Sequence, residues 1–113
     1  MANTIKIDTK SSVSNSGTGS SATTVVTAGG SATLVLLSIL ISNKTAASVQ
    51  VDVFVVKNSG DSVFLIKNAP VPGGSSLEII SGSKIILESS DVLQITSNTA
   101  SALDAAVSYL EQT

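Results

Sequence analysis

Residues 49–67 read VQVDVFVVKNSGDSVFLIK, two apolar runs on either side of a polar turn. In the first run, valines at every second position alternate with Gln50, Asp52 and Phe54. This period of two is the pattern of a β-strand with one buried face. The intervening NSGD segment, residues 58–61, has the residue types that favour a hairpin turn. The stretch therefore predicts two antiparallel strands.

The same alternation of short apolar runs and turn residues continues along the chain. Turns rich in Gly, Asn, Ser and Pro separate candidate strands at 3–8, 22–28, 32–42, 49–57, 62–67, 75–80, 84–88, 92–97 and 103–111. Short strands at roughly ten-residue spacing are typical of all-β sandwiches and barrels. We therefore predict an all-β fold, a single β-sandwich of about eight strands with an immunoglobulin-like or jelly-roll layout.

The chain is expected to have two parts. Residues 1–21 form an N-terminal arm, in which the strand at 3–8 precedes a Ser/Gly-rich linker at 9–21 that has Val13 as its one sizeable apolar side chain. Residues 22–113 form the β-sandwich domain. Its predicted core consists of Val26, Leu34, Leu36, Val51, Val53, Val55, Leu65, Leu77, Ile79, Ile85, Leu87, Val92, Ile95, Val107 and Tyr109.

The last segment, LDAAVSYLEQ at 103–112, fits two periodicities. Leu103, Val107 and Leu110 lie at helical spacing, whereas Leu103, Ala105, Val107 and Tyr109 share a face in a strand. No residue caps a helix cleanly here, and the other candidate elements are strands. We therefore favour a strand.

The run ATLVLLSILI at 32–41 is apolar on both faces and is half the length that a membrane helix needs. Simple alternation puts Leu34, Leu36 and Leu40 on one face and Val35, Leu37, Ile39 and Ile41 on the other. Such a strand in so small a sandwich needs a second cover. We expect the cover to be a long loop or the N-terminal segment, or alternatively a neighbouring subunit.

Residues 68–82, NAPVPGGSSLEIISG, contain both prolines of the chain and a Gly-Gly pair, and they separate two apolar runs. Pro70 and Pro72 fix φ near about −65°, and Gly73-Gly74 permit the positive φ that a reversal needs. We predict a rigid corner at one end of the sandwich, with Val71 held between the two prolines.

The composition lacks most of the residue types that enzymes use for catalysis. The 113 residues include no His, no Cys and no Arg, so the usual general base, thiol nucleophile and bidentate phosphate ligand are missing. Oxygen-rich residues at 58–62 resemble part of a calcium loop, but a hairpin turn explains them better. We expect no enzymatic activity, no catalytic residues, no cofactor and no metal site.

Charge and composition also limit the partners. The net charge is −2, the six lysines are scattered, and aromatic residues make up only 3% of the chain, so no basic or stacking surface for nucleic acid is expected. No signal peptide or membrane span is expected, and the chain should be made in the cytoplasm. The remaining candidates are protein-interaction residues.

Five apolar residues are the candidate interaction positions. Ile5 and Ile7 are expected to dock as an added edge strand on a neighbouring subunit or on another partner protein. The alternative is that they pair with their own sandwich and cover the strand at 32–41. Phe54 and Val56 fall on the polar face of their strand and are expected to point outward, while Val71 sits in the Pro/Gly corner. These features predict a homo-oligomer with cyclic symmetry, a trimer.

Several ordered segments resemble small all-β virion structural proteins of tailed bacteriophages, in particular marine and cyanobacterial phages. The likeness lies in Asn43 at the end of a long apolar strand, in KNAPVPGGSSL at 67–77, in LE at 87–88 followed by Asp91, and in the terminal SYLE at 108–111. The resembling segments run in order from VVTAGG at 25–30 to AVSYLEQ at 106–112, so the resemblance spans residues 25 to 112, nearly all of the domain.

The resemblance implies a non-enzymatic component of a virion that binds a capsid or tail protein of the same particle. A capsid decoration (cement) protein is the first expectation, and a neck, tail or baseplate subunit is the alternative. From another functional class, many small β-sandwiches bind carbohydrate or host receptors, which leaves a carbohydrate- or host-binding module as a further alternative. The resemblance assigns no site residues.

Overall fold

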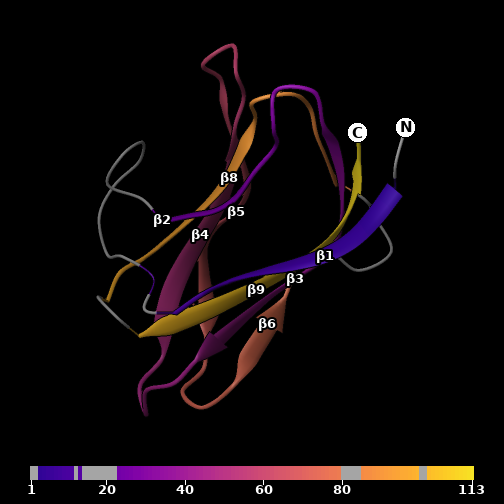
Figure 1. Ribbon diagram of the computed structural model, residues 1–113. Coiled ribbons are helices and arrows are strands. Elements are labelled where there is room, and N and C mark those ends of the chain that lie inside the picture. The colour runs from indigo at the N-terminus through magenta and orange to yellow at the C-terminus, as the bar shows by residue number, and fades with distance from the viewer. Residues whose placement is uncertain (1–2, 12, 14–22, 80–84, 100–101) are drawn as a thin grey trace.

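The computed structural model describes residues 3–11, 13, 23–79, 85–99 and 102–113 (Figure 1). These residues form nine β-strands. The strands are β1 (Asn3–Lys10), β2 (Thr23–Thr27), β3 (Thr33–Asn43), β4 (Val49–Val56), β5 (Ser62–Val71), β6 (Ser76–Glu78), β7 (Ile85–Leu87), β8 (Val92–Ser97) and β9 (Leu103–Gln112). The C-terminal segment is a strand, as the sequence predicts.

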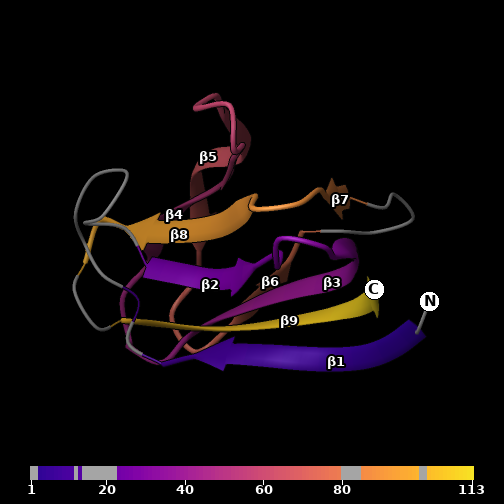
Figure 2. The same cartoon turned by 45° about the horizontal axis from the view of Figure 1, so that its top comes forward.

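The strands form two antiparallel sheets that lie face to face (Figure 2). One sheet has the order β1-β9-β3-β6, with β7 also paired to β3, and the other has the order β2-β8-β4-β5. β6 pairs with the end of β3 and β7 with its beginning, so these two short strands share one side of β3. The arrangement confirms the predicted β-sandwich.

Apolar side chains of the two inner faces form one core. Ten of the predicted core residues are buried there: Val26, Leu34, Leu36, Val51, Val53, Val55, Leu87, Ile95, Val107 and Tyr109. Leu65, Leu77, Ile79 and Ile85 are partly buried against this cluster, and Val92 is half-buried. Because inward residues alternate along each strand, the period-two pattern identified most of the core.

A β-bulge in β3 changes which of its residues face the core. The register with β9 shifts between Leu36 and Ser38, so Leu37 is an extra residue on β3. After the bulge, Ile39 and Ile41 are the buried residues and Leu40 lies on the outside. The simple alternation expected from sequence was therefore wrong for these three residues, because an inserted residue reverses the faces of those that follow.

The Pro/Gly corner is built around a buried asparagine at the end of β3. Asn43 Nδ2 donates to the carbonyl oxygens of Ala47 and Val71, each at 2.8 Å, and its Oδ1 accepts from the backbone of Thr45 at 2.9 Å. The reversal occurs at Gly74, where φ is 70°. A Cβ atom at Gly73 would lie 2.4 Å from the Ala46 carbonyl oxygen, so only glycine fits this close approach.

The N-terminal strand belongs to the same sandwich. β1 pairs along its full length with β9, from Asn3 opposite Gln112 to Lys10 opposite Ala105. The strand thus pairs with its own sandwich, as the alternative expected, and not with a neighbour. It does not cover the strand at 32–41, because β9 lies between β1 and β3. In the stretch expected to be a linker, Val13 is fully buried and its N–H donates to the Leu103 carbonyl at 2.8 Å.

Candidate protein-interaction face

The five-stranded sheet turns one side away from the core, and large apolar side chains gather on it. The register places Ile5 beside Leu110 on β9. Leu110 lies beside Val35 on β3, which lies beside Ile86 on β7. These four residues form an apolar row across four strands, and its two ends are the most open, with Ile5 75% and Ile86 55% exposed.

Three more apolar residues continue this surface along the strands. Ile7, Leu37 and Leu40 are 60%, 38% and 40% exposed, and the bulge in β3 is what turns Leu40 outward. We call the seven residues Ile5, Ile7, Val35, Leu37, Leu40, Ile86 and Leu110 the apolar face. Among the described residues, five of the seven exposed large apolar side chains belong to it. A contiguous patch of this kind is typical of an interaction site.

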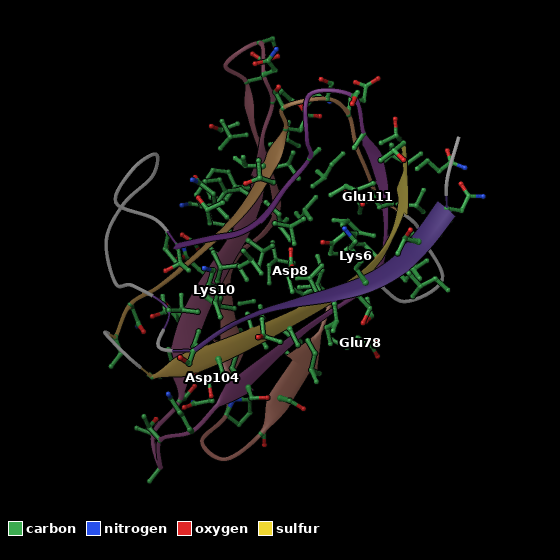
Figure 3. All side chains as sticks on the ribbon, in the orientation of Figure 1. Lys6, Asp8, Lys10, Glu78, Asp104 and Glu111 are labelled. Carbon is green, nitrogen blue, oxygen red and sulfur yellow. The ribbon has the colours of Figure 1, made fainter. Side chains whose placement is uncertain are left out.

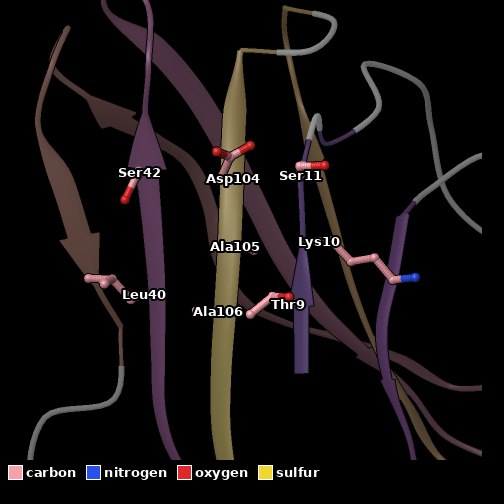
Figure 4. A pocket seen from close by; sticks show the side chains of 8 residues that line it. All are labelled: Thr9, Lys10, Ser11, Leu40, Ser42, Asp104, Ala105 and Ala106. Carbon is pink, nitrogen blue, oxygen red and sulfur yellow. The ribbon is translucent and has the colours of Figure 1, made fainter. Parts of the chain in front are cut away.

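The apolar face ends in a shallow depression. Thr9 on β1 lies beside Ala106 on β9, and Ala106 lies beside Leu40 on β3. The small side chain of Ala106 leaves the surface low between β1 and β3. The depression has a volume of ≈ 460 Å³ and is lined by Thr9, Lys10, Ser11, Leu40, Ser42, Asp104, Ala105 and Ala106 (Figure 4). Beyond it the surface is polar, and Lys44 Nζ lies 2.9 Å from Asp104 Oδ1. The surface therefore changes from apolar to polar along the sheet.

β1 carries the charged residues Lys6, Asp8 and Lys10 (Figure 3). The register pairs Lys6 and Asp8 with Tyr109 and Val107, which face the core, so these two lie on the opposite side of the strand from Ile5 and Ile7. Lys6 Nζ lies 2.8 Å from Glu111 Oε1, and the hydroxyl of Tyr109 donates to Asp8 Oδ2 at 3.0 Å. Burial of the Tyr109 hydroxyl, followed by its hydrogen bond to Asp8, raises the pKa of Tyr109 to about 12. These contacts fix β1 against β9 and turn the side chains of Lys6 and Asp8 toward β9.

The structure brings two of the five expected interaction residues onto the apolar face. Ile5 and Ile7 lie there, and both are exposed. Val56 is half-buried on β4, in the other sheet. Phe54 and Val71 are fully buried, so the expectation that they present interaction surface was wrong.

Phe54 lies on the expected side of β4, but it is covered. Phe64, directly opposite on β5, packs on it with ring centroids 5.0 Å apart and planes tilted by 35°. Lys67 Nζ in turn lies 4.7 Å from the centroid of the Phe64 ring. The aromatic residue that reaches solvent on this sheet is therefore Phe64, which is 38% exposed.

Val71 is buried because the corner folds inward at this point. The residue pairs with Val49 on β4 and belongs to the main core cluster, and its carbonyl accepts from Asn43. Pro70 remains in β5, where it pairs with Gln50 at the edge of the four-stranded sheet. An edge strand tolerates a proline because one of its sides needs no backbone donor.

Sequence reasoning missed most of the apolar face. Leu40 was assigned to the wrong side of β3, and Ile86 received no assignment although the alternation of KIILE at 84–88 puts it opposite Ile85 and Leu87. The signal that pointed to the face was the apolar character of both sides of 32–41. This pattern indicated that one side of the strand at 32–41 contacts another segment or protein. It did not identify the residues of other strands that belong to the same surface.

The main titratable cluster lies elsewhere, between the β4–β5 hairpin and the turn before β8. Asp91 is buried, and its carboxylate accepts from Lys57 Nζ and, at 2.9 Å each, from the N–H groups of Asn58 and Glu88. Burial alone would raise the pKa of Asp91, but the hydrogen bond from Lys57 and those from the two N–H groups outweigh it and lower that pKa. The hydrogen bond to Asp91, followed by that to Glu88, raises the pKa of Lys57. This cluster fastens two turns together.

Within the described ranges, no group of three or more His, Cys, Asp and Glu residues is placed to hold a metal ion. The same part of the chain has no helix long and apolar enough to cross a membrane.

Comparison with known proteins adds no relative. No family model matches the chain, and no curated protein matches it. The fold and the site thus define the protein as a small β-sandwich with an exposed apolar sheet face.

Proposed function

We propose that this protein is a non-enzymatic structural component of a bacteriophage particle. Foremost we propose a capsid decoration protein, found in the virion, which binds a capsid protein through the apolar face. The observation that carries the proposal is the row Ile5–Leu110–Val35–Ile86, which crosses four strands of one sheet and lies open to solvent at both ends. A rigid sheet that presents a contiguous apolar surface suits a stable protein–protein contact.

Two further considerations support the assignment to a particle. The sequence resembles small all-β virion proteins through the segments that build the Asn43 corner and the turn at Asp91. Both of these sites are buried polar networks that fasten loops to the sandwich, which favours a scaffold over a moving active site. Within virions, the second candidate is a neck, tail or baseplate subunit.

A carbohydrate- or host-binding module is the candidate from another class. The observation that favours it is Phe64, a partly exposed aromatic ring with Lys67 beside it. Sugar sites commonly use such a ring as a stacking platform. A glycan array probed with the purified protein separates the two classes, because binding at micromolar concentration that Phe64→Ala abolishes favours the module.

The copy number of the chain in purified phage particles tests the proposal directly. Quantitative mass spectrometry against an isotope-labelled standard should find hundreds of copies if the protein decorates the capsid. Tens of copies or fewer would instead favour the neck, tail or baseplate. Absence of the chain from intact particles would overturn the particle assignment.

The binding face can be tested with particles that lack the protein. Wild-type protein added back should bind, whereas Ile86→Ser and Leu40→Ser should each reduce binding at least about tenfold, since burying such a side chain contributes about 1.5–3 kcal/mol. Val63→Ser is the matched control, because Val63 is 51% exposed but lies on β5 in the other sheet. Equal binding by all four proteins would exclude the apolar face as the contact.

A further inference from the structure

β1 is an edge strand of the five-stranded sheet, with β9 on one side. Among residues 3–11, 13, 23–79, 85–99 and 102–113, no strand pairs with its other edge. β1 is eight residues long and contains neither a proline nor a register shift against β9. A long, regular edge of this kind offers its backbone N–H and C=O groups to another strand.

The sequence of β1 is self-complementary about Ile7. In an antiparallel pair of two β1 strands related by a two-fold axis at Ile7, Lys6 lies opposite Asp8 of the second copy, and Asp8 lies opposite its Lys6. The same register places Ile7 opposite Ile7 and Ile5 opposite Thr9. Every charged residue at the centre thus meets an opposite charge.

Other registers lose this match. An axis at Lys6 puts two lysines opposite each other, and an axis at Asp8 puts two carboxylates opposite each other, and both arrangements are repulsive. A shift by one residue sets the isoleucines of one copy on the charged side of the other. An axis at Thr9 also matches the charges, because it puts Asp8 opposite Lys10, but it pairs only residues 8–10 of the strand. The register centred on Ile7 matches charges and faces over residues 4–10.

We infer that two copies of this chain associate through the free edges of their β1 strands, in the register centred on Ile7. Both side chains contact β9 but keep groups that a second copy can use. Lys6 pairs with Glu111 on β9, remains 46% exposed and has three N–H donors, and Asp8 accepts from Tyr109 on β9 through Oδ2 and has Oδ1 as a second acceptor. A contact about a two-fold axis closes at two copies, so the assembly is a dimer and not the trimer expected from the sequence.

Pairing of the edges has a consequence for the apolar face. Ile7 of one copy lies opposite Ile7 of the other, and Ile5 of each copy lies on the same side of the joined sheets, so the two apolar faces become one surface. This dimer does not depend on the proposed phage role, because it concerns the isolated protein in solution.

A cross-linking experiment tests the register. The chain has no cysteine, so Ile7→Cys introduces a single thiol. Directly opposite residues in an antiparallel pair have Cα atoms about 4.5–5.5 Å apart, which is within the about 4.4–6.8 Å that a disulfide spans. Mild oxidation of full-length Ile7→Cys should therefore give a covalent dimer. In Ile5→Cys the two thiols lie about 13 Å apart along the strands and should not cross-link.

Complementary charge variants test the pairing independently. Lys6→Asp and Asp8→Lys should each raise the dissociation constant of the dimer about tenfold in analytical ultracentrifugation, because each creates like charges across the edge. An equimolar mixture of the two variants should recover wild-type affinity, since opposite charges then meet at both positions. Recovery in the mixture shows that both variants fold, and Lys67→Asp on β5 is the control that should leave the dimer unchanged.

Three results would overturn the inference. They are a wild-type monomer at high micromolar concentration, efficient cross-linking of Ile5→Cys without cross-linking of Ile7→Cys, and no recovery of association in the mixture of the charge variants.

Discussion

The hydroxyl of Tyr109 lies 3.0 Å from Oδ2 of Asp8, although 101 positions separate the two residues in the chain. This hydrogen bond joins β9 to one side of β1, and the proposed dimer contact lies at the opposite edge of β1. It also makes the attachment of the N-terminal strand observable, because Tyr109 is the chain's single tyrosine and the chain has no tryptophan.

Titration of the ultraviolet absorbance of tyrosinate should give a midpoint near the pKa of about 12 that Tyr109 has in the folded protein, against an ordinary value of 10.0. Since the folded pKa is raised, the contribution to stability is fully present below pH 10 and is lost as the pH rises through about 12. Asp8→Asn should lower the midpoint but leave it above 10, because burial remains the first cause. A midpoint at 10 in the folded wild type would mean that β1 does not cover Tyr109.

Asp91 should make the protein sensitive to acid. Its pKa is lowered in the folded state from an ordinary 3.8, so the stability that it contributes is present above that value and is lost as the pH falls through the folded pKa. Asp91→Ala leaves Lys57 and two N–H groups without their acceptor and should cost about 3 kcal/mol at neutral pH.

Urea unfolding measured between neutral pH and about pH 2 checks this prediction. The free energy of unfolding should fall more steeply with acid in the wild type than in Asp91→Asn. Asp61→Asn, at an exposed carboxylate in the neighbouring hairpin, is the control and should behave as the wild type does. Parallel curves for wild type and Asp91→Asn would contradict the assignment.

Gly73 should not tolerate a side chain. A Cβ atom there would lie 2.4 Å from the Ala46 carbonyl oxygen and 2.5 Å from its carbon, which are backbone atoms that cannot rotate away. Gly73→Ala should therefore cost about 1–3 kcal/mol in thermal or urea unfolding. Gly30→Ala is the matched control, since nothing lies within 4 Å of the added atom, and it should leave the stability unchanged or slightly higher.

The two phenylalanines that stack on the four-stranded sheet should differ in their contribution to stability. Phe54 is fully buried, so Phe54→Ala should cost about 3–5 kcal/mol. Phe64→Ala should cost clearly less, because its ring is 38% exposed and loses mainly the contacts with Phe54 and Lys67. Urea midpoints compare the two directly, and equal losses would show that Phe64 is buried in solution.

Much of the fold could be predicted because strand formation here depends on neighbouring residues. The alternation in 49–56 and the turn residues at 58–61 act over two to four positions, and these interactions determined both strands of the hairpin. The positive φ at Gly74 followed in the same way from the glycine pair beside Pro72.

The candidate site was less predictable because contacts between distant residues determine it. The bulge after Leu36 reverses the faces of β3 and turns Leu40 outward, and alternation within one strand carries no signal for an inserted residue. Phe54 was expected to be exposed, but the side chain that covers it comes from the opposite strand. Burial of this kind depends on register, which single-strand patterns do not specify.

The sequence by itself determined the all-β class, the positions of the strands, most of the core, and the apolar character of both faces of the strand at 32–41. Only the tertiary structure decided that β1 pairs with β9, that Val13 enters the core, and that Ile5 and Ile86 share a sheet face with Leu110 between them in register. The physical reason is the range of the interactions. Backbone conformation and turn geometry are set over a few residues, whereas sheet order is set by which distant strands bury their apolar faces together.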